Sequence, residues 1–163
     1  MTRRLHRQYV AQASAAEHTL TALAPKTVHD IRIAWEESCA APGDFAADLY
    51  RNLFAIAPTA ANLFPGDLTQ QRQRLTRTLT ESLALLDKPQ ELLLLLRASG
   101  VRHVHYRTDF EHFPQLGMAL DLTFQQRLEG RFDRQRRDAW RLFYSSMAAV
   151  MCAAMAAVLL EQA

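Results

Sequence analysis

The sequence predicts a single all-α domain, and three observations support that fold class. The chain has 163 residues, of which 49% are hydrophobic, and this is enough to bury one compact core. It contains only 5 glycines, and no stretch alternates apolar and polar residues between turn pairs as a strand would. Its prolines and glycines fall at intervals that suit helices of ordinary length.

The first half of the chain begins with an N-terminal extension, residues 1–24, ahead of a domain that spans residues 25–163. The opening MTRRLHRQYVAQAS is basic but lacks a continuous apolar segment, so no secretory signal is predicted. Pro25 precedes the first core helix, whose apolar stripe stops at the APG of residues 41–43. A second helix in DFAADLYRNLFAIAP ends before Pro58, and a short helical turn follows in TAANLF.

Four further helical segments are expected in the second half. Asp67 is placed to cap a long helix that reaches about residue 86, and another helix begins near Pro89 and contains ELLLLLRASGVRHVHY. A helix with Pro114 in its first turn continues to about residue 128, and the last helix spans about residues 133–160.

The last helix contains the uncharged stretch FYSSMAAVMCAAMAAVLL, which approaches the length that crosses a bilayer. Its alanines, serines and cysteine make it only weakly hydrophobic, and no second segment of this kind accompanies it. A buried core helix is therefore favoured over membrane insertion.

Charge and cysteine usage narrow the function classes. The formal net charge is only +2, from 19 Lys+Arg and 17 Asp+Glu that are interspersed, so no nucleic-acid partner is expected. Cys39 and Cys152 lie far apart in helical surroundings, which is typical of free thiols in a reducing compartment rather than of a disulfide framework. We therefore expect a cytoplasmic protein.

Two polar residues stand where apolar ones would be expected. Gln71 occupies the place on the helix after Asp67 that the apolar stripe of Leu68 and Leu75 should fill. An amide buried without partners costs about 1–3 kcal/mol, so Gln71 forms a hydrogen bond, points to solvent at the helix edge, or meets a ligand. Tyr50 poses the same question, because its ring can pack among leucines while its hydroxyl still needs a partner.

Three of the six histidines cluster in SGVRHVHYRTDFEHFPQLG, residues 99–117. No cysteine or carboxylate cluster accompanies them, so they do not form an ordinary zinc site. On a helix His103 and His105 lie about 200° apart, so only one of them can face a given pocket. Helical periodicity does not decide which one, because the five leucines that precede them cover every face.

Several short motifs occur in an order that resembles the globin family, in particular bacterial single-domain globins and the haem domain of flavohaemoglobins. They are LYRNLF with Tyr50, the proline after it, LF ending at Phe64, QQRQRL with Gln71, VRH ending at His103, HFPQLG, and DAWRLFY. The resemblance covers roughly residues 27–155. It implies a globin-like bundle of about seven to eight helices around a haem pocket, with the N-terminal extension outside it.

The resemblance implies roles for particular residues. His103 would be the proximal ligand of the iron of haem b, with His105 facing away. Phe64 would stack on the porphyrin, and Leu75 would form an apolar wall that limits ligand access. Tyr50 and Gln71 would both donate hydrogen bonds to bound oxygen, which explains the two polar residues together.

Other positions concern the edge of the pocket and its proximal side. Arg74 and Arg107 are candidates to pair with haem propionates. Flavohaemoglobins surround the proximal histidine with a tyrosine and a glutamate, but here Phe113 and Met155 stand at those positions. We therefore expect little anionic character at the proximal ligand, and peroxidase-like chemistry is disfavoured.

The function that the resemblance implies is reversible binding of oxygen or other diatomic ligands, for storage, delivery or scavenging. One alternative is nitric oxide dioxygenase activity, which would require a separate reductase because the chain has no flavin or nicotinamide domain. Another is a haem-based sensor that acts through a partner, with residues 1–24 as its main support. Whether the protein is an enzyme, and whether it forms homo-oligomers, is left open by the sequence.

Overall fold

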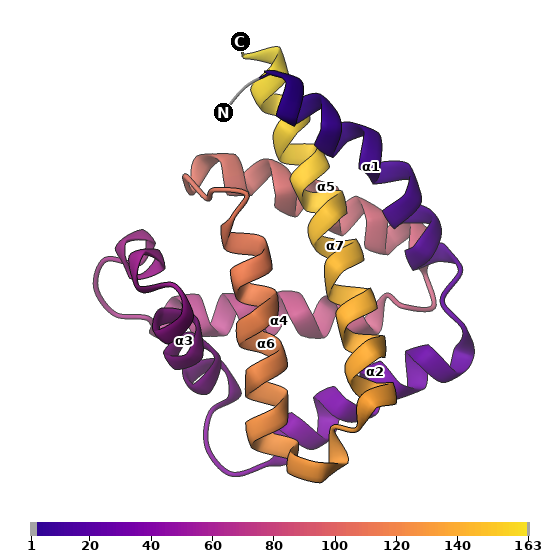
Figure 1. Ribbon diagram of the computed structural model, residues 1–163, viewed down its shortest axis with the longest axis vertical. Coiled ribbons are helices and arrows are strands. Elements are labelled where there is room, and N and C mark those ends of the chain that lie inside the picture. The colour runs from indigo at the N-terminus through magenta and orange to yellow at the C-terminus, as the bar shows by residue number, and fades with distance from the viewer. Residues whose placement is uncertain (1–2, 163) are drawn as a thin grey trace.

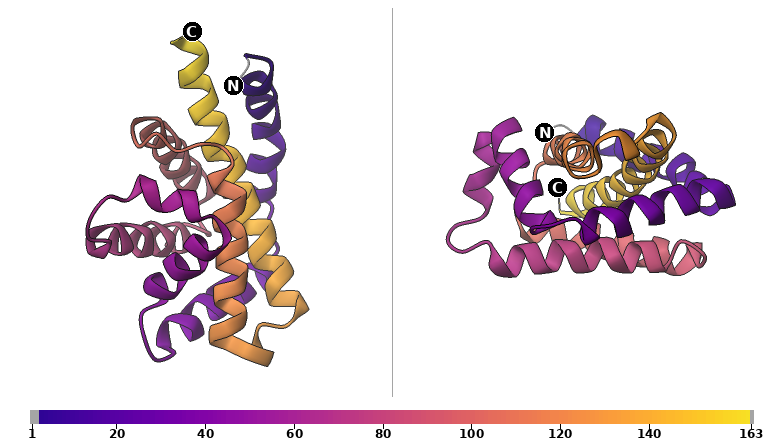
Figure 2. Two further views of the ribbon diagram at one scale, coloured as in Figure 1. Left: turned by 60° about the vertical axis from the view of Figure 1, so that its left-hand side comes forward. Right: turned by 90° about the horizontal axis from the view of Figure 1, so that it is seen from below.

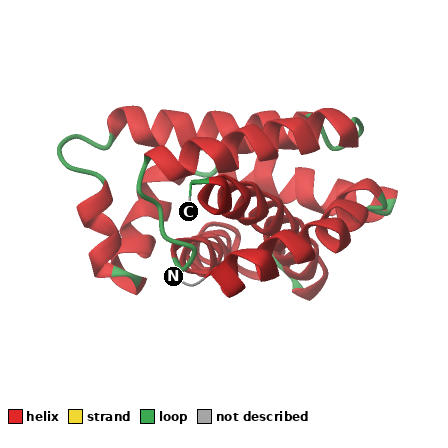
Figure 3. Cartoon of the chain, turned by 90° about the horizontal axis from the view of Figure 1, so that it is seen from above, coloured by secondary structure: helices red, strands yellow, loops and turns green. Residues whose placement is uncertain are grey.

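The computed structural model describes residues 3–162, and these residues form helices and connecting loops without any strand (Figures 1 and 3). The predicted all-α fold is confirmed. The elements are α1 (Arg3–Thr21), α2 (Pro25–Ala40), α3 (Phe45–Ile56), the 3₁₀ helix η1 (Pro58–Leu63), α4 (Thr69–Ala84), α5 (Pro89–His105), α6 (His112–Leu128), the 3₁₀ helix η2 (Glu129–Arg131) and α7 (Arg134–Glu161).

Short polar side chains and prolines begin these helices, as the sequence indicated. Asp44 and Asp133 accept hydrogen bonds from the backbone N–H groups of Ala46 and Arg136, which caps α3 and α7. Asp67 was predicted to cap α4 but lies one residue before the N-cap position, which Leu68 occupies without a side-chain hydrogen bond; Asp67 accepts instead from the backbone N–H of Thr69 at 3.0 Å. α4 ends at Ala84, slightly before the predicted end. Hydrogen bonds from Thr69 hold the pKa of Asp67 below its usual value.

The helices cross one another in two layers (Figures 1 and 2). α6 and α7 run alongside each other, and α4 and α5 cross behind them. α7 contacts α1, α5, α2 and α6, and α3 packs on α6. The long last helix is therefore the centre of the molecule.

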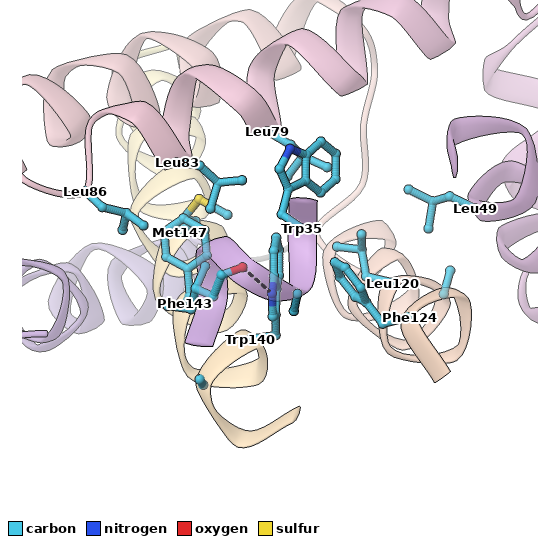
Figure 4. Close-up of a cluster of buried hydrophobic side chains, with 14 of the residues drawn as sticks. Trp35, Leu49, Leu79, Leu83, Leu86, Leu120, Phe124, Trp140, Phe143 and Met147 are labelled. Carbon is cyan, nitrogen blue, oxygen red and sulfur yellow. Dashed lines mark hydrogen bonds between the residues drawn. The ribbon is translucent and has the colours of Figure 1, made fainter. Parts of the chain in front are cut away.

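Aromatic residues from several helices fill the core (Figure 4). Trp140 of α7 donates a hydrogen bond from its indole nitrogen to the backbone carbonyl of Ile31 at 3.0 Å. The ring centroid of Trp140 lies 4.4 Å from that of Phe124 of α6 and 6.2 Å from that of Trp35 of α2. These contacts join α2, α6 and α7 on the side of the molecule away from the loop that connects α5 and α6.

Helix α1 packs along α7 and forms part of a second apolar cluster. Tyr9 stacks on Phe110, in the loop before α6, with 4.4 Å between ring centroids, and His6 stacks on the same ring at 5.7 Å. The cluster also contains Phe113 and Cys152. The N-terminal segment is thus a helix tied to the loop between α5 and α6.

Within the described residues, α7 is the one helix long and apolar enough to cross a membrane by length and composition. One face of α7 is buried against the other helices, as expected for a core helix. Cys152 on that face is buried and Cys39 on α2 is exposed, and both are free thiols. Burial raises the pKa of Cys152 to about 12, so this thiol stays protonated.

Candidate functional site

A cavity of about 300 Å³ lies where α3, η1, α4, α5 and α6 meet. Six of the seven residues that the sequence assigned to a haem site line it: Tyr50, Phe64, Gln71, Arg74, Leu75 and His103. They come from segments that are up to about a third of the chain apart, so the fold has gathered the predicted residues around one space. The cavity falls within the size range of small-molecule sites.

His103 lies in the last turn of α5, and its ring is held in one tautomer. Its Nδ1 lies 2.7 Å from the backbone carbonyl of Ser99, and because a carbonyl only accepts, Nδ1 carries the proton. Nε2 is then unprotonated and available as a ligand atom. Burial lowers the pKa of His103, which favours this neutral form at neutral pH.

His105 takes no part in the cavity. Its side chain is exposed, and it is not among the residues that line the cavity. The choice between His103 and His105, which helical periodicity left open, is therefore decided by how α5 packs.

The position of α5 depends on a close approach to α7 at Gly100. A Cβ atom on Gly100 would lie 2.3 Å from the backbone oxygen of Met151 and 2.9 Å from the Cβ of Ala154. Only glycine permits this crossing distance. The contact lies one turn before His103, so it fixes the depth at which the imidazole enters the cavity.

Tyr50 and Gln71 bring two polar groups to the same cavity from α3 and α4. Tyr50 is only 3% exposed, and burial raises the pKa of its hydroxyl, which the neighbouring Gln71 amide and Arg72 guanidinium partly offset. The phenol is therefore protonated at neutral pH and can donate a hydrogen bond. Gln71 is half-buried, which excludes the fully solvent-exposed position that the sequence had left open.

Aromatic rings form much of the wall. The rings of Tyr50 and Phe64 meet edge to face with 5.3 Å between centroids, and Phe54 lies 6.1 Å from Phe64. The ring centroid of His103 lies 5.4 Å from that of Phe113 and 5.9 Å from that of Tyr106. The wall is thus mostly apolar, with few polar groups directed at particular places.

Three polar lining residues were not predicted: Tyr106, Thr108 and His112. They lie at the end of α5, in the following loop and at the start of α6, where helical periodicity gives no information about side-chain direction. His112 accepts a hydrogen bond at Nδ1 from the backbone N–H of Asp109, 2.9 Å away, so its Nε2 carries the proton in the neutral ring.

Arg107 is the one predicted site residue that does not line the cavity. It is exposed and has a φ of 55°, in the left-handed region that a non-glycine residue seldom adopts. This conformation ends α5 and turns the chain into the loop that carries Thr108. The backbone of Arg107, rather than its guanidinium, shapes this edge of the cavity.

The first half of α4 packs loosely beside the cavity. From residue 69 to residue 78 no side chain of α4 is buried, whereas Leu79 and Leu83 further along are. The apolar Leu75 and the amide of Gln71 both belong to the unburied half, and both line the cavity. A flat apolar group beside them would complete the packing that this half of the helix lacks.

Comparison with known proteins gives one family. The family model described as Globin matches residues 47–151. The chain belongs to the globin family. A solved structure of a hexacoordinated haem protein from an anhydrobiotic tardigrade has the same fold, with a TM-score of 0.73 and 13% sequence identity over 82% of this chain and 96% of that one. No curated protein matches the chain in sequence.

As a member of the globin family, the protein binds haem. The residues present fit that group, because the cavity combines a neutral imidazole with an unprotonated Nε2, an apolar aromatic wall and a helix that lacks part of its packing. The globin departs from the flavohaemoglobin pattern on the proximal side, where Phe113 and Met155 are both buried in the apolar cluster with Cys152. Neither side chain can form a hydrogen bond to His103.

Proposed function

We propose that this globin holds haem b through His103 Nε2 and reversibly binds oxygen or another diatomic ligand beside Tyr50 and Gln71. The observation that carries the proposal is that one cavity contains His103 in its ligating tautomer together with the two polar residues. Haem, when bound there, supplies an iron that can take a small gaseous ligand. The protein supplies the ligand atom, the hydrogen bonds and the exclusion of water.

Tyr50 and Gln71 act as hydrogen-bond donors to the ligand. Because the pKa of Tyr50 is raised, its hydroxyl keeps its proton and can donate to a ligand that carries partial negative charge. Gln71 contributes an amide N–H from a different helix, so the two donors approach from separate directions. Such donors slow the release of oxygen more than that of a less polar ligand.

The proximal side favours storage or delivery over oxygen cleavage. The proton on His103 Nδ1 is shared with the neutral carbonyl of Ser99, not with a carboxylate, so the imidazole gains little anionic character. Phe113 and Met155, at the positions where flavohaemoglobins have the tyrosine and the glutamate, are apolar and supply no negative charge to the imidazole. Reversible binding is the chemistry that this arrangement supports best.

Arg74 is the residue we assign to the carboxylates of the cofactor. It lines the cavity from α4 and its side chain is otherwise exposed, so its guanidinium can reach a propionate at the cavity mouth. Arg107 does not line the cavity and receives no such role in this proposal.

A second function, nitric oxide dioxygenation, uses the same two donors. A pocket that holds oxygen for long enough can present it to nitric oxide, and a separate reductase would then have to restore the ferrous protein. The buried, protonated Tyr50 is the observation that favours this function. Nitrate formation that continues only when a reductase is supplied would distinguish it from storage.

The test is the optical spectrum of the purified chain titrated with haem in its ferric, ferrous, oxygenated and carbonmonoxy forms. We expect uptake of one haem and a ferrous form that converts to a stable oxygenated one. Rapid oxidation on mixing with air, without an oxygenated intermediate spectrum, would contradict reversible binding. Failure to take up haem in stoichiometric amount would overturn the assignment of the cavity.

A further inference from the structure

A larger cavity, of about 960 Å³, lies between α6 and α7 outside the haem site. We call it the α6–α7 groove. Helix α1 borders one end through Tyr9 and Gln12, and Phe113 is the one lining residue that the groove shares with the haem cavity. The groove is therefore a separate space, and the globin function does not account for it.

Small residues on α7 make room for the groove. Gly117 of α6 serves a different purpose, because it lets the ring of Tyr144 pack directly against the backbone of α6, where a Cβ would lie 2.8 Å from that ring. Ser145, Ala148 and Ala149 line the groove along α7. Larger residues at these positions would fill the space between the helices, as they do in an ordinary helix interface. The walls beyond them are apolar and include Phe124 and Trp140.

Charged groups lie at both ends of the groove and differ in sign. At one end Asp121 accepts hydrogen bonds from Arg137 and Arg141, which lie 2.7 and 3.0 Å from its Oδ2. Asp121 and Arg141 line the groove and Arg137 does not, but Arg137 balances the Asp121 carboxylate, so one positive charge is in excess at this end. The side chain of Arg141 is 54% exposed and lines the groove, and Glu111 lines the end near Tyr9.

We propose that the α6–α7 groove binds a free long-chain fatty acid. Its acyl chain lies along the apolar floor between α6 and α7, and its carboxylate pairs with Arg141. The excess positive charge at that end and the carboxylate of Glu111 at the other fix the orientation of a molecule with a single anionic head.

The dimensions suit this ligand. The groove lies in the upper part of the volume range of small-molecule sites, about 300–1,000 Å³. Arg141 and Cys152 line it from positions eleven residues apart on α7, which corresponds to about 16 Å along a helix with a rise of 1.5 Å per residue. An extended acyl chain needs a long, narrow, apolar space of this kind. An anionic membrane surface fits less well, because Glu111 would repel it.

The experiment is a calorimetric titration of the haem-loaded carbonmonoxy protein with dodecanoate below its micelle concentration. Carbon monoxide occupies the ligand position of the iron, so the dodecanoate carboxylate cannot bind the iron. We expect one molecule to bind per chain, and a fluorescent probe, 11-(dansylamino)undecanoate, to be displaced by dodecanoate. Dodecanol, which has the same chain without the charge, should bind at least fivefold more weakly.

Two variants separate the contributions of the head group and the chain. Arg141→Gln should weaken dodecanoate binding at least fivefold and leave dodecanol binding unchanged, whereas Arg134→Gln, a control on the same helix whose side chain is 95% exposed, should change neither. Ala149→Phe fills the groove and should abolish binding of both molecules. None of these residues lines the haem cavity, so the carbonmonoxy spectrum checks that each variant is folded.

Several outcomes would overturn the proposal. They are an absence of dodecanoate binding to the unmodified protein, or equal binding by the unmodified, Arg141→Gln and Ala149→Phe proteins. Light scattering that shows a dimer which Ala149→Phe converts to a monomer would instead identify a second copy of the chain as the occupant. Binding to phosphatidylglycerol vesicles but not to dissolved dodecanoate would identify a membrane surface.

Discussion

At the scale of single residues, His103 and His105 show how the surroundings of a side chain decide its role. Both are imidazoles on the same helix, and the sequence around them did not distinguish their surroundings. His103 enters the cavity and shares its Nδ1 proton with Ser99, whereas His105 is exposed. The difference comes from the direction in which α5 crosses α7, which depends on contacts between residues about fifty positions apart.

The first prediction follows from that difference. We expect His103→Ala to lose normal haem retention and His105→Ala to keep it, because only the former removes the ligand atom. The measurement is the rate of haem transfer to an excess of a haem-scavenging apoglobin, followed by the Soret band. His103→Gly with added imidazole should recover a five-coordinate ferrous spectrum. Similar transfer rates for the two alanine variants would refute the ligand assignment.

The second prediction concerns the two donors. Tyr50→Phe and Gln71→Leu each remove one hydrogen bond, so each should raise the oxygen dissociation rate, by about tenfold for every 1.4 kcal/mol lost. The rate is measured by displacing oxygen with carbon monoxide in a stopped-flow instrument. Carbon monoxide dissociation serves as the control, because this ligand carries less negative charge and should respond less. If neither variant changes the oxygen rate, these groups do not touch the ligand.

At the scale of the helices, Asp121 joins α6 to α7 through Arg137 and Arg141. Burial alone would raise the pKa of Asp121, but the hydrogen bonds from the two arginines outweigh it, and the pKa lies below its usual value. A depressed pKa means that the carboxylate stabilises the folded state above the unfolded value, near 4. This stabilisation is lost as the pH falls through the lower folded value.

The third prediction is that Asp121→Asn lowers the free energy of unfolding at pH 7 by about 1–2 kcal/mol, allowing for screening of the partly exposed arginines. The deficit should shrink as the pH falls from about 4 through the lower pKa of Asp121 in the folded protein, because the unmodified carboxylate first takes up its proton in the unfolded chain and finally in the folded one as well. Urea unfolding at several pH values gives the curve. Asp138→Asn, which breaks an exposed pair with Arg134, is the control and should have a small effect at every pH. A deficit independent of pH would contradict an electrostatic origin.

The fourth prediction tests the contact between α5 and α7. Alanine is a better helix former than glycine by about 1 kcal/mol, yet Gly100→Ala should destabilise the protein by about 1–3 kcal/mol because its Cβ collides with the backbone of Met151. It should also speed haem loss, since α5 carries His103. Gly130→Ala, where nothing lies within 4 Å of the new Cβ, should stay within about 0.5 kcal/mol. Equal stabilities would show that the helices can separate without cost.

The bounds of the helices could be predicted well from the sequence, whereas the packing between helices could not, for a physical reason. Helix limits depend on local signals such as Pro25, Pro89 and the Asp133 cap, and the observed bounds follow them closely. Cavity-lining residues in the loop, such as Thr108, have no periodic signal. The α6–α7 groove depends on the distance between two helices, which Gly117 and the small residues of α7 set together. No pattern within either helix alone contains that information.

At the scale of the whole molecule, the packing is uneven about the haem cavity. α2, α6 and α7 meet in a core of aromatic rings around Trp140, which is complete without a cofactor. The first half of α4 and η1 have little of this support, because η1 buries only Ala60 and α4 buries no residue before Leu79. Haem would therefore act as part of the core for one side of the molecule and not for the other.

The fifth prediction is that haem slows amide hydrogen exchange selectively. Without haem, residues 58–78 should exchange fastest among the helices, because little apolar burial opposes their local opening. Adding haem at about 100 times its dissociation constant stabilises the folded protein by about 2.7 kcal/mol, and protection should rise most in this segment and in the loop after α5.

The amides around Trp140 and Phe143 should change least, since their packing does not involve the cavity. Exchange followed by mass spectrometry at peptide resolution distinguishes this pattern from a uniform change. Uniform protection of all helices would mean that the apoprotein opens as a single unit, and that residues 58–78 draw no particular support from haem.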